Sequence, residues 1–107
     1  MKDTIFKMSS SYLKALAHPT RLKILDILKD KELCVCVILE ELQLEQSNVS
    51  QHLKVLREQG IVKSRRDGSK IMYKVKDKNV FIIFDNVKES LLNQLEETSA
   101  ELKKGGV

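Results

Sequence analysis

Apolar side chains recur at helical spacing in five stretches of this chain, which predicts five helices. Polar breaks separate the stretches, and Pro19 suits the first turn of a helix because its missing N–H costs little there. The predicted helices cover residues 3–17, 19–29, 35–42, 46–59 and about 78–103. The last of them carries a long apolar stripe, which consists of Val80, Phe84, Val87, Leu91 and Leu95.

Two short extended runs lie between the fourth and fifth predicted helices. Residues 61–66 and 70–75 flank Asp67-Gly68-Ser69, and an Asp-Gly pair favours a tight hairpin turn because glycine accepts a positive φ. Three central helices followed by a β-hairpin are typical of the winged helix-turn-helix fold. We therefore predict a single, mainly α domain over residues 1–107, with a two-stranded β-hairpin wing and the element order α-α-α-α-β-β-α.

The first and last predicted helices lie outside this three-helix core, and their apolar stripes need a surface to cover them. A chain of 107 residues builds only a modest core, which leaves little surface of its own for both stripes. A two-fold contact between two copies would bury them. We therefore expect a homodimer formed through the first and last helices. The alternative is that both helices pack on their own subunit.

Charge is unevenly distributed along the chain. The formal net charge is +4, and residues 54–78 hold nine Lys or Arg against three Asp or Glu, a net of +6. Such a surface attracts nucleic acid phosphates, although a lysine-rich hairpin can also be an ordinary solvated surface. The chain is 42% apolar and 32% charged, with no bilayer-length apolar run and no secretory pattern. We expect a cytoplasmic protein without a membrane partner.

The fourth predicted helix has a polar face suited to reading DNA. At about 100° per residue, Val49, Leu53 and Leu56 fall on one side and anchor the helix to the core. The other side carries hydroxyls, an amide and a cation, which can bind base edges and phosphates in the major groove. The predicted DNA-contacting residues are Gln46, Ser47, Ser50, Gln51, His52 and Lys54. The alternative is a generic amphipathic surface helix.

The hairpin adds a second basic surface. Arg65, Arg66 and Lys70 lie around its tight turn, where they would contact the DNA backbone or the flanking minor groove. The predicted partner is double-stranded DNA, and a two-fold dimer implies a pseudo-palindromic operator. An enzyme is not expected, because the sequence contains no nucleophile–base–orienter set and no phosphate-binding glycine loop. A protein-interaction module that reuses the fold without DNA stays open.

Two cysteines, Cys34 and Cys36, lie at or just before the start of the third predicted helix. So short a loop rarely forms an internal disulfide, and a reducing cytosol favours free thiols. Three interpretations stay open. In the first, the pair captures a soft ion such as As(III), Sb(III) or Cd(II). In the second, it senses oxidants through an intersubunit or strained vicinal-type disulfide. In the third, both cysteines are small apolar residues without chemistry. Because residues i and i+2 of a helix diverge by about 200°, ion capture would unwind the helix start.

Three segments resemble the ArsR/SmtB family of transcriptional repressors. Residues 16–25 (LAHPTRLKIL) are similar to the family's second-helix signature, and residues 32–36 (ELCVC) to the metal-binding box of its arsenic- and cadmium-responsive members. Residues 48–62 (NVSQHLKVLREQGIV) resemble its recognition helix and the segment that follows. The resemblance covers roughly residues 8–100. It implies a dimeric winged-helix repressor that leaves its operator on binding a metal ion or another inducer.

Several positions depart from the metal sites of that family. Leu39 stands where the arsenic-responsive pattern has a third cysteine, and no cysteine precedes Cys34. Counting the zinc pattern from Asp77 gives unsuitable side chains at Asn79, Ser90 and Asn93. Glu45 stands where a serine usually caps the recognition helix. We predict a repressor that needs no cofactor to bind DNA and is released by a soft ion at the thiol pair or, alternatively, by oxidation of that pair.

Overall fold

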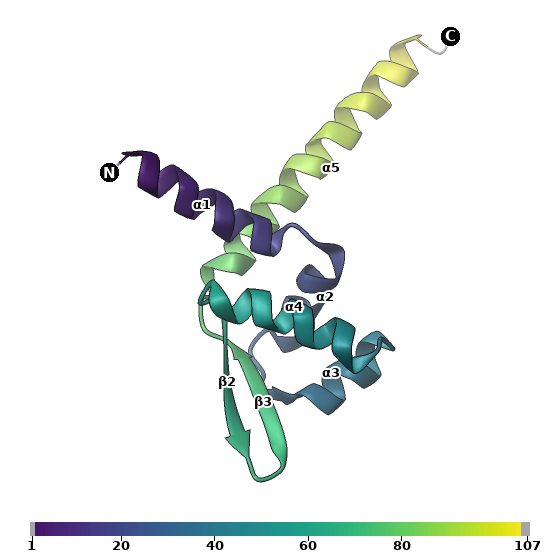
Figure 1. Ribbon diagram of the computed structural model, residues 1–107. Helices are drawn as coiled ribbons and strands as arrows, with labels where there is room; N and C mark the ends of the chain where they lie inside the picture. Colours follow the sequence, from purple (N-terminus) through teal and green to yellow (C-terminus); the bar gives the residue numbers. More distant parts are fainter. Residues whose placement is uncertain (1, 106–107) are drawn as a thin grey trace. The chain divides into compact units, whose positions relative to one another are not determined.

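Eight elements follow one another along residues 2–105, the part of the chain that the computed structural model describes (Figure 1). They fall into two compact units, one ending at residue 77 and the other beginning at residue 78. The first unit contains four helices and a small sheet, and the second contains one long helix. The predicted mainly α winged helix-turn-helix fold is confirmed, and the observed element order differs from the predicted one by a short additional strand between α2 and α3.

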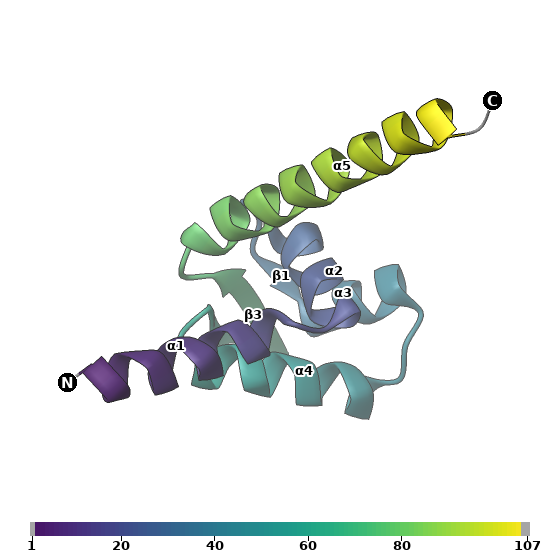
Figure 2. The ribbon, with the colours of Figure 1, turned by 90° about the horizontal axis from the view of Figure 1, so that it is seen from above.

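The four helices of the first unit are α1 (Lys2–Leu16), α2 (Pro19–Leu28), α3 (Val35–Leu42) and α4 (Gln46–Glu58). All four lie close to their predicted bounds, because each carries its own helical repeat of apolar residues. α2 contacts both α3 and α4, and α1 contacts α2 and α4. Figure 2 shows α1 passing alongside the C-terminal end of α4.

The helix N-termini are closed by different groups. The His18 side chain caps α2, since its Nδ1 accepts a hydrogen bond from the Thr20 N–H at 3.1 Å. Cys34 caps α3, since its Sγ accepts one from the Cys36 N–H at 3.2 Å. Glu45 occupies the N-cap of α4 without a side-chain hydrogen bond, as expected from the missing serine.

The sheet has three antiparallel strands in the order β1-β3-β2: β1 (Leu33–Cys34), β2 (Val62–Asp67) and β3 (Lys70–Val75). β2 and β3 are the predicted hairpin, and Gly68 in its turn has a φ of 63°. β1 was not predicted from the sequence, because two residues are too few to show an alternating pattern. β1 adds Cys34 beside Met72 of β3. Figure 1 shows the hairpin extending away from the helices of its unit.

The core of the first unit lies between α2, α3, α4 and the sheet. Val49, Leu53 and Leu56 of α4 are each at most 1% exposed, which confirms that this side of the helix anchors it. Side chains from the surrounding elements that are at most 2% exposed join them in the core: Ile24, Leu28, Ile38, Ile61, Val62 and Val75. α4 therefore presents its opposite, polar side to solvent.

The second unit consists of α5 (Asn79–Gly105). Val80 is buried and Phe84 is half-buried, but the last three residues of the predicted stripe are open: Val87 is 48%, Leu91 53% and Leu95 65% exposed. α1 also exposes apolar side chains, at Ile5, Phe6, Met8 and Leu13. Most of both apolar stripes is thus uncovered within one copy of the chain. Among residues 2–105, no helix has the length and hydropathy needed to cross a membrane.

Candidate nucleic-acid interface

The polar side of α4 is an exposed row of hydrogen-bonding groups. Ser47, Ser50, Gln51 and Lys54 are all exposed, and Gln46 lies at the first position of the helix. The opposite side of the same helix is buried in the core. The positions of these side chains are therefore fixed by helix packing. Such a row can bind base edges and phosphates.

His52 lies at the flank of this row and is held by the protein. Its Nδ1 accepts a hydrogen bond from Arg21 Nε at 3.1 Å, and its ring lies 4.3 Å from the ring of His18, centroid to centroid. Burial, followed by the charges of His18 and Arg21, lowers the pKa of His52. Arg21 Nη1 also donates to the carbonyls of Lys14 and Ala15. His52 therefore ties α4 to α2.

The hairpin cations do not form the single cluster that the sequence suggested. Arg65 and Arg66 are neighbours in β2, and neighbouring residues of a strand point to opposite faces. Arg65 binds Glu32, with Nε donating to both carboxylate oxygens at 3.1 and 3.0 Å and Nη2 donating to Oε1 at 2.5 Å. These hydrogen bonds lower the pKa of Glu32 and raise that of Arg65. Lys70 pairs in register with Asp67 beside the turn.

Glu32 is a functional candidate that the sequence analysis did not single out. It precedes β1, and its partner Arg65 is 33 positions away in the chain. Arg65 and Cys34 are both in register with Met72, so the three residues share one row across the sheet. The short strand thus connects the cysteine segment to the wing. Only the register of β1 reveals this connection, and no sequence pattern marks it.

The two cysteines are joined by a disulfide, and the expectation that they would not form one is wrong for this structure. The expectation rested on the shortness of the loop between the two cysteines. Cys34 has an extended backbone, with φ −66° and ψ 148°, because it is the N-cap of α3. The two Cα atoms lie 5.2 Å apart, within the range that disulfides span. Cys34 is 8% exposed, whereas Cys36 is an exposed residue.

A groove of about 420 Å³ brings the cysteines together with three of the predicted DNA-contacting residues, Gln46, Ser50 and Lys70. Cys34, Cys36 and Leu39 line one side of it, and Gln46 and Ser50 of α4 line another. The wing contributes Ser69, Lys70, Ile71 and Tyr73 to its lining. Two sites that the sequence analysis predicted separately, a thiol pair and a DNA surface, therefore share one groove, which we call the thiol groove.

Metal-binding side chains are sparse around the cysteines. Leu39, at the position of a third family cysteine, lines the thiol groove with an apolar side chain. Within residues 2–105, no group of three or more His, Cys, Asp or Glu side chains is placed to hold a metal ion. An ion bound by Cys34 and Cys36 would need further ligands from outside this set.

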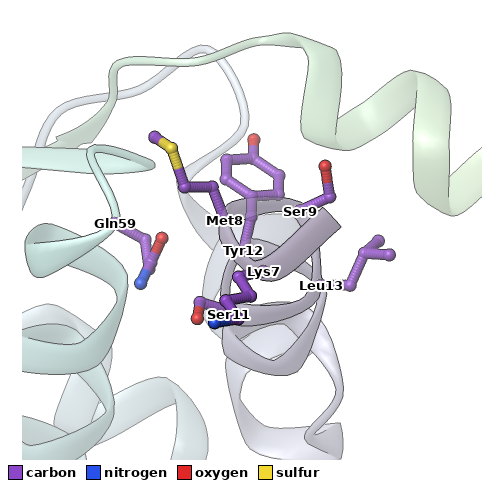
Figure 3. A pocket seen from close by; sticks show the side chains of 7 residues that line it. All are labelled: Lys7, Met8, Ser9, Ser11, Tyr12, Leu13 and Gln59. Carbon is purple, nitrogen blue, oxygen red and sulfur yellow. The ribbon is translucent and has the colours of Figure 1, made fainter. Parts of the chain in front are cut away.

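A second, broader hollow of about 740 Å³ lies along α1 and reaches Gln59 (Figure 3). Met8, Tyr12 and Leu13 give it a largely apolar lining. The Tyr12 hydroxyl donates a hydrogen bond to Asp77 Oδ2 at 2.6 Å. Burial, followed by this carboxylate, raises the pKa of Tyr12, so the phenol stays protonated and keeps donating. The hollow thus lies on the exposed apolar side of α1.

These features define a winged helix-turn-helix DNA-binding protein, with α4 as the recognition helix and the hairpin as the wing. Residues 18–64 match the bacterial regulatory protein family arsR. The chain is 36% identical to the arsenical resistance operon repressor of Staphylococcus xylosus, with 89% of each chain covered. It is also 32% identical to the transcriptional regulator Rv0081 of Mycobacterium tuberculosis, over 97% of this chain and 95% of that one. The chain belongs to the ArsR family of transcriptional regulators.

Solved structures agree with this assignment. The crystal structure of Mycobacterium tuberculosis Rv0081 superposes with a TM-score of 0.77, covering 88% of this chain and 95% of that one at 33% identity. The homodimeric winged helix-turn-helix domain of Mb0332 from Mycobacterium bovis gives a TM-score of 0.77 over 90% and 89% of the two chains, at 29% identity. The relatives are transcriptional regulators, which confirms that the chain is not an enzyme.

Proposed function

We propose that this chain is a homodimeric, sequence-specific repressor that leaves a pseudo-palindromic operator when a signal reaches Cys34 and Cys36. The observation that carries the proposal is the thiol groove, where both cysteines line the same surface as Gln46 and Ser50 of the recognition helix. A chemical change at the sulfurs would then act within the DNA-binding surface.

In this proposal the exposed side of α4 reads the major groove. Ser47, Ser50, Gln51 and Lys54 contact bases and phosphates, and Gln46 contacts them from the helix N-terminus, where the helix dipole favours phosphate. On the wing, Arg66 and Lys70 bind the DNA backbone, and Arg65 joins them when Glu32 releases it. His52 positions α4 through Arg21 and His18.

The dimer is proposed to form through α1 and α5. The support is the exposed apolar surface on both helices, including Phe6 at 71% and Leu95 at 65% exposed. The winged helix-turn-helix domain of Mb0332 from Mycobacterium bovis, which has a similar fold, is homodimeric. Two copies related by a two-fold axis would place two α4 helices on successive turns of the duplex, about 34 Å apart.

Two kinds of thiol-directed signal are supported by different observations. The Cys34–Cys36 disulfide favours a redox signal. The similarity to an arsenical resistance operon repressor favours a soft ion such as As(III), Sb(III) or Cd(II). An ion requires the reduced pair and a further ligand from an exogenous thiol, solvent or the second subunit. We place the redox signal first, because the disulfide belongs to this chain itself.

Replacing both cysteines, Cys34→Ser with Cys36→Ser, tests the proposal. We expect unchanged operator affinity, because serine preserves the size of the side chain and its ability to cap α3. The variant should show no response to arsenite, cadmium or a diamide–glutathione mixture. The wild-type protein is expected to leave the DNA with whichever of these carries the true signal and to stay bound with the others. Fluorescence anisotropy on duplex DNA from the promoter upstream of the gene measures both properties. A response retained in this variant would remove the thiols from the mechanism.

Replacing Glu32→Gln is expected to tighten DNA binding and make it more salt-dependent. The change removes the carboxylate that holds Arg65, which leaves the guanidinium available for one further phosphate. The slope of log affinity against log salt concentration should steepen by about 0.9. Glu96→Gln makes the same charge change on exposed α5 and serves as the control. An unchanged slope in Glu32→Gln, or an equal change in both variants, would contradict the assignment of Arg65.

A further inference from the structure

The structure contains the internal disulfide and yet leaves the polar side of α4 exposed. Cys34 and Cys36 are joined at the start of α3, while Ser50 and Gln51 remain exposed on α4. α3 begins directly after Cys34 with its cap hydrogen bond in place, so the bridge does not unwind the helix. The internal disulfide by itself therefore gives no structural reason for DNA to be released.

The two sulfurs differ in ways that direct thiol exchange to one of them. Cys36 is exposed, whereas Cys34 is 8% exposed, and an incoming thiolate attacks the accessible sulfur. The Cys36 N–H at the start of α3 donates to Cys34 Sγ at 3.2 Å. This hydrogen bond favours the thiolate of Cys34, which makes that sulfur the better leaving group.

The thiol groove beside Cys36 has the size and lining of a small-ligand site. Its volume of about 420 Å³ lies within the usual range for such sites, about 300–1,000 Å³. Leu39 and Ile71 can cover the carbon chain of a ligand, and Gln46 can hydrogen-bond it. Lys70 is the charged residue that lines this groove, so it favours a carboxylate on the ligand.

We propose that Cys36 is the attachment site for a carboxylate-bearing low-molecular-weight thiol, and that the mixed disulfide, not the internal disulfide, is the form excluded from DNA. The attached molecule would occupy the thiol groove between Ser50 and Lys70, where the DNA backbone would otherwise lie. The proposal rests on the proposed function. It replaces release of DNA through unwinding of the start of α3 with direct occlusion of the proposed DNA-binding surface by the attached molecule.

The exchange step is balanced without any further oxidant. The thiolate of the small molecule attacks Cys36 Sγ and forms a new sulfur–sulfur bond there. The Cys34–Cys36 bond breaks, and Cys34 leaves as a thiolate that takes a proton from solvent. The sulfur of the small molecule is oxidised and Cys34 is reduced, so the number of disulfides is unchanged.

Occlusion is tested with three defined forms of the full chain, using 3-mercaptopropionate as the probe. Reduced and internally bridged wild-type protein are compared with a Cys34→Ser variant carrying the probe on Cys36, since this variant cannot expel it. We expect the first two forms to bind promoter duplex within about twofold of each other, and the loaded variant to bind at least about tenfold more weakly. Dithiothreitol should restore its affinity. Equal affinity before and after loading would overturn the proposal, as would loss of binding by the internal disulfide alone.

A matched control separates occlusion from the mere addition of a negative group. Asn93→Cys, made in the Cys34→Ser and Cys36→Ser background, carries the same probe on exposed α5. We expect its DNA affinity to change by less than about twofold on loading. A loss equal to that of the Cys36 adduct would show that the adduct acts through charge in general, and the occlusion proposal would fall.

The role of Lys70 is tested by the choice of thiol, independently of DNA. The rate at which internally bridged protein forms the adduct is followed by intact-protein mass spectrometry with 3-mercaptopropionate and with neutral 2-mercaptoethanol. We expect Lys70→Gln to lower the ratio of the two rates by about threefold or more, and Lys74→Gln, on the same strand outside the groove, to leave it unchanged. An equal effect of both variants would overturn the ligand class. If no form bound DNA, the proposed function would fail, while these rates would still show whether Cys36 is the attachment site.

Discussion

Ser50→Glu is expected to lower affinity for operator DNA by about a hundredfold. Ser50 is exposed on the polar side of α4 and lines the thiol groove. A carboxylate at this position would face DNA phosphates and would replace a hydroxyl that can donate a hydrogen bond. Like charges placed together in an interface cost several kcal/mol, which exceeds the contribution of a single surface contact. Fluorescence anisotropy at fixed ionic strength measures the change.

The matched control for Ser50→Glu is Asn93→Glu, which adds one negative charge to an exposed position of α5. Asn93 lies opposite the apolar stripe of that helix, so neither the proposed dimer surface nor the reading surface is altered. We expect its operator affinity to stay within about threefold of wild type, since a solvent-exposed charge on α5 is screened by salt. Similar losses in both variants would mean that α4 is not the reading element.

Leu91→Glu combined with Leu95→Glu is expected to convert the dimer to single subunits. Both side chains are more than half exposed within one copy of the chain, at 53% and 65%, so the subunit should still fold. In the proposed dimer they would be buried, and two unpaired carboxylates in an apolar interface would oppose association strongly. Sedimentation velocity measures the assembly, and circular dichroism reports whether the helices persist.

The same double variant should also lose most of its operator affinity, because one subunit can bind only one half-site at a time. Asn86→Glu with Asn93→Glu adds the same charge to the opposite side of α5 and should remain dimeric. A Leu91→Glu, Leu95→Glu protein that stayed dimeric would show that α5 is not the interface. One that became monomeric but bound operator unchanged would show that dimerisation is unnecessary for recognition.

Much of the fold follows from short stretches of sequence. The third helix was predicted over residues 35–42 and spans Val35–Leu42, because its apolar repeat is complete within that stretch. The side of α4 that carries Val49 and Leu53 was predicted to be buried for the same reason. The turn at Gly68 followed from glycine's tolerance of a positive φ. Each of these features depends on residues only a few positions apart.

The arrangement of the candidate site was less accessible from sequence. The three basic residues of the wing were expected together, but strand alternation separates Arg65 from Arg66, and Glu32 binds Arg65. The cysteines were expected to remain unbridged, because the spacing alone does not show that Cys34 has an extended backbone. Both outcomes depend on where β1 begins and which strand it joins.

The sequence by itself determined the five helices, the hairpin, the polar side of α4 and the family to which the chain belongs. All of these follow from the local periodicity of apolar residues and from short motifs. Only the tertiary structure decided that Glu32 meets Arg65 across 33 positions of chain, and that Cys36 lies in one groove with Ser50 and Lys70. The physical reason is that such contacts arise from strand register and helix packing, which join residues distant in the chain and leave no repeat in the sequence between them.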